Sequence, residues 1–268
     1  MGARCLGAIR QYSALAPAEI QALIARKKFP CADAAGEWGF CDLWTGPAWT
    51  GKAPALDVEA VRRELPTLLQ CVEDAFDVSK LAIARVFSAA RYGFIRPHRD
   101  WMGSEVPFTR LHVPLQTNPR ALNFEDAVVY HMNAGEIWYL DGSRVHGGGC
   151  LADEVRLHLV LDFAPQAAPE DVLRDRAAHA SGPPLPLSRP AMTPAQRAAL
   201  RDLRPLLGRA TLSPLTDLLG TIHYDRQIDS AAAYDWLCAI AADGGDPETI
   251  ENARATREKY LGPANRSS

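Results

Sequence analysis

Two residues with metal-ligand chemistry, His98 and Asp100, lie two positions apart in the segment 95–100. Alternate side chains of an extended segment point the same way, so both can face one point while Arg99 between them faces away. His146, on a later segment, offers a third ligand. Two imidazoles and one carboxylate form a facial triad, which leaves the opposite positions of an octahedral metal open. The spacing therefore predicts a non-haem Fe(II) site that can bind O2.

Arg156 adds a second chemical group to this pattern. It lies within the alternating, strand-like run 155–161. Its guanidinium is a permanently charged fork that matches the geometry of a carboxylate. A His-x-Asp pair alone is common by chance, but together with His146 and Arg156 it favours a metal site. The four residues predict iron and a dicarboxylate co-substrate, 2-oxoglutarate. A metal- or ligand-binding module without turnover is the rival interpretation.

Composition and charge narrow the class of protein. The chain has 268 residues, 47% of them hydrophobic, and a formal net charge of −3. No basic field is present to neutralise phosphates, so nucleic acid is an unexpected partner. The sequence has no signal-peptide pattern at its start and no apolar run of roughly 18 residues, so we expect a cytoplasmic protein without membrane contact. The six cysteines are expected to be reduced thiols without a chemical role.

Periodicity predicts helices first and then a series of strands. Helical spacing covers 17–26 and 58–76, with Pro66 as a candidate interruption of the second helix. Strand-like segments separated by Gly, Pro and Asn follow at 37–44, 81–87, 109–115, 128–132, 136–140 and 156–163. The pattern predicts an α+β fold with a double-stranded β-helix core, that is, a jelly-roll or cupin-like core, and packing helices laid on it.

The C-terminal third has a proline-rich and then helical sequence pattern, unlike the strand-rich part before it. The proline-rich segment 181–190 reads as a linker, and Thr193 with Pro194 is a typical helix start. Helical patterns follow around 200–207, 215–222, 234–240 and 250–260. We therefore expect a jelly-roll oxygenase domain at 1–180 and a C-terminal helical subdomain at 191–268. The helices could form a homodimer interface or a lid, and the pattern does not decide between them.

Several motifs resemble those of a known family. They are the segments 97–100 (PHRD), 110–112 (RLH), 135–141 (GEIWYLD) and 156–162 (RLHLVLD), together with His146. The chain resembles the aspartyl/asparaginyl β-hydroxylase family, and within it the bacterial cis-hydroxylases of free L-proline. Further likeness, at 38–40, 222–224 and 234–237, extends the resemblance over most of the chain.

The resemblance implies a jelly-roll dioxygenase that couples decarboxylation of 2-oxoglutarate to hydroxylation of a C–H bond. By this likeness His98, Asp100 and His146 are the iron ligands, and Arg156 pairs with the distal carboxylate of 2-oxoglutarate. A carboxylate ligand at Asp100 argues against halogenation. The expected substrate is a free L-amino acid, L-proline or a cyclic analogue such as L-pipecolate. A linear, peptide-bound or carrier-bound amino acid is the alternative.

Contacts to the substrate are predicted less directly. Arg110 and His112 match an Arg-x-His pair that lines the pocket of the family, next to either co-substrate or substrate. For the substrate carboxylate Arg110 is the first candidate and Arg96 the second, each with a surface ion pair as the alternative.

Aromatic and histidine side chains complete the set of candidates. Trp38, Phe40, Trp101 and Trp138 could form an apolar wall, or they could simply belong to the core. His131 is a candidate pocket residue or a structural histidine. His158, two residues from Arg156 on the same strand, is a candidate for orienting the groups around it.

Overall fold

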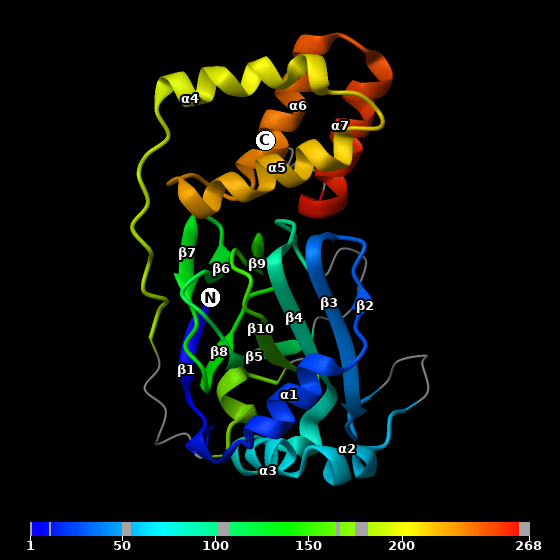
Figure 1. Cartoon of the computed structure of the whole chain (residues 1–268), viewed down its shortest axis with the longest axis vertical. Helices are drawn as coiled ribbons and strands as arrows, with labels where there is room; N and C mark the ends of the chain where they lie inside the picture. The colour runs from blue at the N-terminus through cyan, green and yellow to red at the C-terminus, as the bar shows by residue number, and fades with distance from the viewer. Residues whose placement is uncertain are drawn as a thin grey trace.

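The computed structural model describes residues 2–10, 12–49, 55–100, 108–164, 167–174 and 182–262. Its β-rich N-terminal part lies below a group of C-terminal helices (Figure 1). The strands are β1 (Arg4–Ala8), β2 (Phe29–Pro30), β3 (Ala34–Thr45), β4 (Leu81–Ile95), β5 (Thr109–Gln116), β6 (Ala121–Glu125), β7 (Val128–His131), β8 (Glu136–Tyr139), β9 (His146–Cys150) and β10 (Arg156–Phe163). The α-helices are α1 (Pro17–Ala25), α2 (Val58–Glu64), α3 (Pro66–Ala75), α4 (Pro194–Ala199), α5 (Leu212–Asp225), α6 (Ala232–Gly244) and α7 (Pro247–Leu261).

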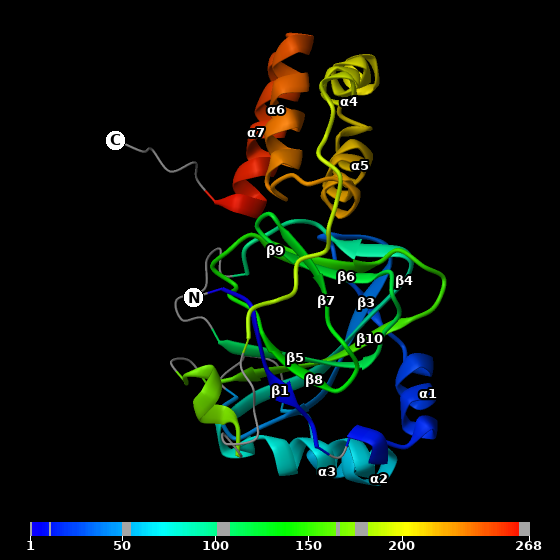
Figure 2. The same ribbon diagram turned by 90° about the vertical axis from the view of Figure 1, so that its left-hand side faces the viewer.

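The strands form one antiparallel sheet that curls on itself. Its main path is β1-β8-β5-β10-β4-β9-β6-β7, and β3 joins through β4 and carries β2. The long strand β4 pairs with β10, with β3 and, near its end, with β9. Because β4 pairs with three other strands, the sheet bends into two facing layers (Figure 2). This is the jelly-roll core that the sequence predicts.

Successive side chains of β10 alternate between the hydrophobic core and the enclosed side of the curled sheet. Leu157, Leu159 and Leu161 are fully buried and pack with residues of α1, α2 and α3 in the main hydrophobic cluster. Burying each of these leucines contributes about 2 kcal/mol relative to leaving it exposed. Arg156 and His158 alternate with them and so point to the enclosed side of the curled sheet. The helices thus cover one face of the sheet and leave the other for the site.

Pro66 divides the predicted long helix in two. The residue before it, Leu65, has φ −134° and ψ 52° and is not helical, as expected for a residue that precedes proline. Pro66 then begins α3, where no backbone N–H is required. The buried carboxylate of Glu19 accepts from the free N–H groups of Thr67 and Leu68, both at 2.9 Å. A distant side chain therefore caps the second helix.

The C-terminal helices form a second, smaller hydrophobic cluster. The segment 182–193 runs beside β7, where the Leu187 N–H donates to the Val129 carbonyl at 2.8 Å (Figure 1). Thr193 and Gln196 then form a capping box at the start of α4. Apolar residues of α5, α6 and α7 pack together above the sheet. The helix expected around 200–207 is a 3₁₀ helix (Leu200–Leu206) that contains Pro205. That the two parts are separate domains stays a prediction.

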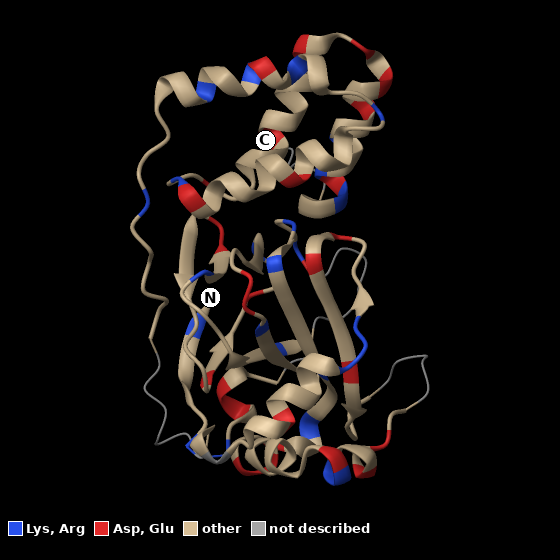
Figure 3. Ribbon diagram, in the orientation of Figure 1, with Lys and Arg blue, Asp and Glu red and all other residues tan. Residues whose placement is uncertain are grey.

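The surface carries both signs of charge. Lysine, arginine and acidic residues alternate over the strands and the helices (Figure 3). Within the described residues, no helix is both long enough and apolar enough to cross a membrane.

His223 on α5 makes the stability depend on pH. Its ring is 1% exposed and packs 4.1 Å from the Phe124 ring. Burial, and next the charge of Arg189, lower the pKa of His223 from 6.5 to about 3. Between these values the unfolded chain binds a proton that the folded chain excludes. The free energy of unfolding therefore falls as the pH falls through this window, by about 1.4 kcal/mol per pH unit for one such group.

We expect His223→Phe to reduce this pH dependence, because phenylalanine keeps the apolar packing and binds no proton. Urea unfolding at a series of pH values between about 6 and about 4 measures it. Equal slopes of unfolding free energy against pH in the variant and the unsubstituted protein would contradict the assignment.

Candidate metal centre and its pocket

The structure brings His98, Asp100 and His146 together. One potential ligand atom from each lies within 4.8 Å of the others. The Nε2 atoms of His98 and His146 lie 3.3 and 3.6 Å from the two carboxylate oxygens of Asp100. The two histidines face each other through an antiparallel bridge, in which the His146 N–H donates to the His98 carbonyl at 2.9 Å. This bridge explains how residues 48 positions apart converge.

Both imidazoles are oriented by the backbone. Nδ1 of His98 lies 2.8 Å from the Arg96 carbonyl, and Nδ1 of His146 lies 3.0 Å from the Arg144 carbonyl. A carbonyl only accepts hydrogen bonds, so Nδ1 carries the proton in each ring and Nε2 keeps its lone pair. Those lone pairs face the carboxylate of Asp100. The arrangement is that of two metal-ligating histidines held by partners of their other ring nitrogen.

The electrostatics favour the protonation states that a divalent metal needs. Burial raises the pKa of Asp100, but Arg110 and then the two histidines bring that pKa well below its ordinary value. Burial lowers the pKa of His146 to about 4. Near neutral pH Asp100 is thus an anion and His146 is neutral. Two nitrogen donors and one anionic oxygen on one side of the site fit an octahedral Fe(II) with open positions.

The cluster lies in a cavity of about 440 Å³ inside the curled sheet. Strand alternation supplies its walls, with Trp38 and Phe40 from β3, Phe87 from β4 and His112 from β5. The other described lining residues are Cys31, Asp33, Arg85, Ile95, Arg99, Arg110, Asn123, Leu140, Gly147, Gly148, Arg156, Lys259 and Tyr260. The cavity therefore has aromatic walls and several charged groups beside the metal ligands.

Arg156 is a buried cation ready for an anionic ligand. It is 3% exposed, and its Nη2 donates to Asn123 Oδ1 at 2.6 Å. Burial lowers its pKa to about 10, so it stays charged at neutral pH. Among the described residues, no carboxylate pairs with it and its Nε has no hydrogen-bond partner. Leaving a buried charge unpaired costs several kcal/mol, which a carboxylate of 2-oxoglutarate would offset.

Glycine at position 148 makes room for this group. A Cβ there would lie 2.8 Å from Asn123 Oδ1 and 3.1 Å from Arg156 Nη2. Any larger residue would displace the amide or the guanidinium. The residues present therefore fit both iron and a dicarboxylate.

Arg110 is held by two carboxylates. Its Nε and Nη2 donate to the oxygens of Asp162 at 2.6 and 3.0 Å, and its Nη1 donates to Asp100 Oδ2 at 2.6 Å. The guanidinium thus orients the Asp100 carboxylate, a candidate metal ligand, and is itself neutralised. His112 beside it is 6% exposed, and burial, Arg110 and Arg156 keep its pKa well below the ordinary value. Both line the cavity, as the family likeness implies.

The structure does not place Arg96 in the pocket. Its guanidinium donates to Asp217 Oδ1 at 2.6 Å, and to Ser213 Oγ and the Tyr260 hydroxyl at 2.8 Å each. It is absent from the described residues that line the cavity. With all three guanidinium nitrogens bonded, Arg96 is unsuited to hold a substrate carboxylate.

The position of Arg99 differs from the sequence-based expectation that its side chain faces away from the site. Arg99 lines the cavity, although the alternation rule turns it away from the metal ligands. The rule fails because only His98 of this segment forms a β-bridge, and the chain turns at Asp100. The Arg99 side chain donates to the Leu261 carbonyl at 3.1 Å, and its buried Nε has no partner among the described residues.

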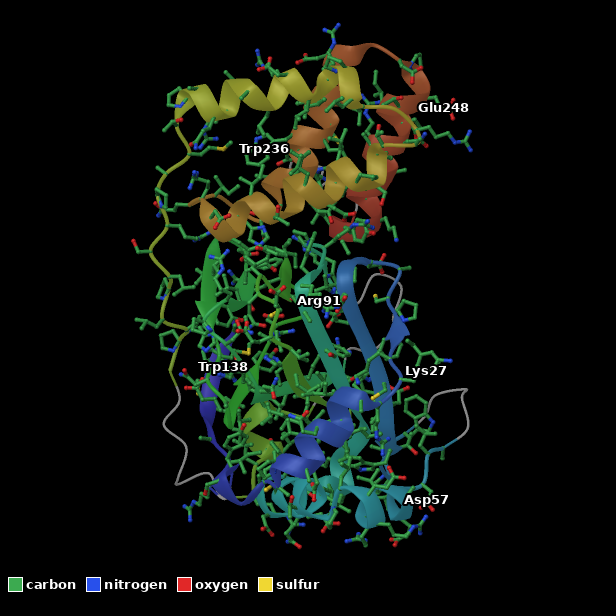
Figure 4. The ribbon with its side chains drawn as sticks, in the orientation of Figure 1. Lys27, Asp57, Arg91, Trp138, Trp236 and Glu248 are labelled. Atoms are coloured by element: carbon green, nitrogen blue, oxygen red, sulfur yellow. The ribbon has the colours of Figure 1, made fainter. Side chains whose placement is uncertain are left out.

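The other candidate contacts divide into lining and non-lining residues. Trp38 and Phe40 line the cavity, whereas Trp138 stacks on Tyr130 with ring centroids 5.2 Å apart, at the β8 side of the sheet (Figure 4). His131 contacts the Ala121 carbonyl through Nδ1 at 2.9 Å. His158 is fully buried, 3.1 Å from Arg156 Nη2. Trp101 lies outside the described residues.

Sequence reasoning missed several lining residues, among them the polar residues Asp33, Asn123, Lys259 and Tyr260. None lies in one of the motifs, and Lys259 and Tyr260 come from the end of α7, far from the motifs in the sequence. No signal in a single sequence shows that a C-terminal helix ends beside the metal ligands.

Comparison with known proteins agrees with this geometry. Residues 18–165 match the model of aspartyl/asparaginyl β-hydroxylase, and residues 169–266 match that of the C-terminal part of L-proline 3-hydroxylase. The L-proline cis-4-hydroxylase of Rhizobium meliloti (strain 1021) is 30% identical over 236 residues, which cover 85% of this chain and 84% of that protein. The L-proline cis-3-hydroxylase 2 of Streptomyces sp is 30% identical over 237 residues, 83% of this chain and 81% of the relative. The L-proline cis-3-hydroxylase 1 of Streptomyces sp is 26% identical over 205 residues, 74% and 70% of the two chains.

Fold, site and relatives together define a 2-oxoglutarate-dependent non-haem iron dioxygenase. The chain belongs to the aspartyl/asparaginyl β-hydroxylase family, which confirms the resemblance seen in its motifs.

Proposed function

We propose that this dioxygenase hydroxylates a C–H bond of a free L-amino acid, with L-proline as the first substrate to test and L-pipecolate as the second. The observation that carries the proposal is the likeness to L-proline cis-hydroxylases over more than four fifths of the chain. Support comes from an aromatic-walled cavity of about 440 Å³, which suits a small cyclic substrate.

In this proposal His98, Asp100 and His146 hold the iron, and Arg156 with Asn123 holds the distal carboxylate of 2-oxoglutarate. Bound Fe(II) supplies the activation of O2 that couples decarboxylation of 2-oxoglutarate to hydroxylation of the substrate. Arg110 keeps Asp100 ionised and oriented. Trp38, Phe40 and Phe87 exclude water and position an apolar ring.

The test is anaerobic reconstitution with Fe(II) and 2-oxoglutarate, followed by O2 and a panel of amino acids. Mass spectrometry detects succinate and a product heavier by one oxygen atom. Hydroxyproline or hydroxypipecolate supports the proposal. Product from linear or carrier-bound amino acids only would move the substrate to the alternative class, and absence of succinate with every compound would favour a binding module without turnover. His98→Ala protein is the matched blank.

Arg99 is our candidate for the substrate carboxylate. Of the arginines that line the described cavity, Arg85 pairs with Asp42, Arg110 pairs with Asp162, and Arg156 serves the co-substrate. Like Arg156, Arg99 combines a cavity position with no carboxylate partner and a buried Nε without a hydrogen bond among the described residues, and it is the one of the two that the co-substrate leaves free.

We expect Arg99→Gln to raise the KM for L-proline by about tenfold to about 100-fold, the usual loss of a charged hydrogen bond of 1.5–3 kcal/mol. The KM for 2-oxoglutarate should stay within about twofold, and Arg99→Lys should recover part of the affinity. Steady-state kinetics with each compound varied in turn measures both. Equal KM values for L-proline in Arg99→Gln and unsubstituted enzyme would return the role to another residue.

Two further expectations remain proposals. We place the enzyme in the cytoplasm, since its co-substrate and amino-acid substrates are small metabolites.

A homodimer through the C-terminal helices is supported by the exposed Leu206 and Leu218, which are 58% and 51% accessible. Sedimentation of the unsubstituted protein and of Leu218→Glu tests this interface.

A further inference from the structure

The segment 96–100, which carries two of the three metal ligands, belongs to no strand. Strand β4 ends at Ile95, and within the segment only His98 forms a β-bridge, with His146. Two further backbone bonds reach it from the β-rich part, from the Arg96 N–H to the Asp33 carbonyl and from the Asp100 N–H to the Gly142 carbonyl, both at 3.0 Å. They leave the backbone of Pro97 and Arg99 without a partner in the described strands and loops, and metal sites need their ligands within a few tenths of an ångström. Other contacts must therefore fix this segment.

The C-terminal helices supply those contacts, beginning with Arg96. Its guanidinium reaches Asp217 and Ser213 on α5 and the Tyr260 hydroxyl on α7. Arg96 itself is 9% exposed, and its bond to the Tyr260 hydroxyl is buried, whereas those to Asp217 and Ser213 are partly buried. A buried, fully bonded guanidinium of this kind is rigid and directional, in contrast with an ion pair on the surface.

Helix α6 and the end of α7 hold the next residues of the segment. The Tyr234 hydroxyl donates to the Pro97 carbonyl at 2.7 Å, and the Tyr234 ring stacks on Tyr260 with centroids 5.4 Å apart. The Arg99 N–H donates to the Tyr260 carbonyl at 3.0 Å. Helices α5, α6 and α7 thus each bond to the chain immediately before or between His98 and Asp100.

We propose that the helical subdomain sets the metal affinity of the site by holding segment 96–100, with Arg96 and Tyr234 as the positioning residues. The helices act through Arg96, Pro97 and Arg99, the residues before and between the ligands. The inference rests on the metal-ligand assignment of the proposed function. It gives the subdomain a role different from a lid or a dimer interface, because its contacts are polar and centred on the His-x-Asp segment.

The first measurement is Co(II) binding to the full-length protein, by titration calorimetry and visible absorption, without 2-oxoglutarate or substrate. Arg96→Gln is expected to weaken Co(II) binding by about tenfold or more, and Tyr234→Phe by about threefold to tenfold. Arg257→Gln is the matched control, since Arg257 pairs with Asp235 at 3.0 Å and joins α7 to α6 without touching the segment. Its Co(II) affinity should not change.

The second measurement needs no metal. The N–H groups of His98 and Asp100 donate to the carbonyls of His146 and Gly142. In metal-free protein, hydrogen exchange of the peptide that covers 96–100 should be faster by about tenfold in Arg96→Gln and unchanged in Arg257→Gln. Tyr234→Phe, which removes a single hydroxyl, serves the same test if Arg96→Gln does not fold.

The possible results distinguish a wrong metal assignment from a wrong positioning role of the helices. If Co(II) binding is the same in unsubstituted and His98→Ala protein, the metal assignment fails, and hydrogen exchange alone then decides on the positioning role. If exchange of 96–100 and Co(II) affinity in Tyr234→Phe and Arg96→Gln both match the control, the helices do not position the segment, and the inference is overturned.

Discussion

Replacement of His98, Asp100 or His146 by alanine is expected to abolish succinate formation while the fold is retained. Each side chain offers one of the three ligand atoms that lie within 4.8 Å of one another. Loss of a partner that merely orients a ligand already lowers metal affinity or activity by about 10-fold to 100-fold, so loss of a ligand should exceed about 100-fold. The readouts are succinate formation, Co(II) titration and the far-ultraviolet circular dichroism of each variant.

His131→Ala is the matched control for these substitutions. This histidine lies on β7, bonds to the Ala121 carbonyl and is absent from the described cavity lining. It should keep its Co(II) affinity and most of its activity. Full activity in any of the three ligand variants would exclude the triad as the metal site, whereas equal losses in His131→Ala would point to a general loss of folding.

The sequence predicts best the strands whose two faces differ in polarity. Strand β10, with apolar residues toward the helices and polar ones toward the cavity, was predicted with the bounds that the structure has, and so was the interruption at Pro66. Strand β6 (ALNFE) was missed because three of its five residues, Ala, Asn and Glu, are depleted in strands, and strand β9 was missed as well. Three of the five residues of β9 are glycines, a composition typical of loops.

The metal site could be predicted further than the pocket around it. Ligand identity and spacing are properties of the sequence, and the structure brings the three predicted ligands together. The partners of an arginine are not such a property. Arg96, Arg110 and Arg156 all carry the same charge, yet helix α5 binds the first, Asp162 binds the second, and the third has no carboxylate among the described residues. Only the pairing of strands and helices distinguishes them.

Arg156→Ala is expected to raise the KM for 2-oxoglutarate by about 100-fold, with a smaller effect on the KM for the amino acid. The variant loses a charge-assisted pair with the distal carboxylate, worth about 3 kcal/mol, in a site that is 3% exposed and poorly screened by water. Because no carboxylate of the described residues pairs with Arg156, its removal leaves no unpaired anion behind. The protein should therefore be no less stable to urea, and its metal affinity should be preserved.

Arg156→Lys and Arg91→Ala complete this experiment. Lysine keeps the charge but not the fork that donates to both the ligand and Asn123, so its KM should lie between those of the alanine variant and the unsubstituted enzyme. Arg91 is an exposed arginine of β4 paired with Glu37, and its removal should change neither KM. A KM for 2-oxoglutarate that rises equally in Arg91→Ala and Arg156→Ala would indicate a general charge effect. An unchanged KM in Arg156→Ala would place the co-substrate against another cation of the cavity, and the paired Arg110 would be the next to replace.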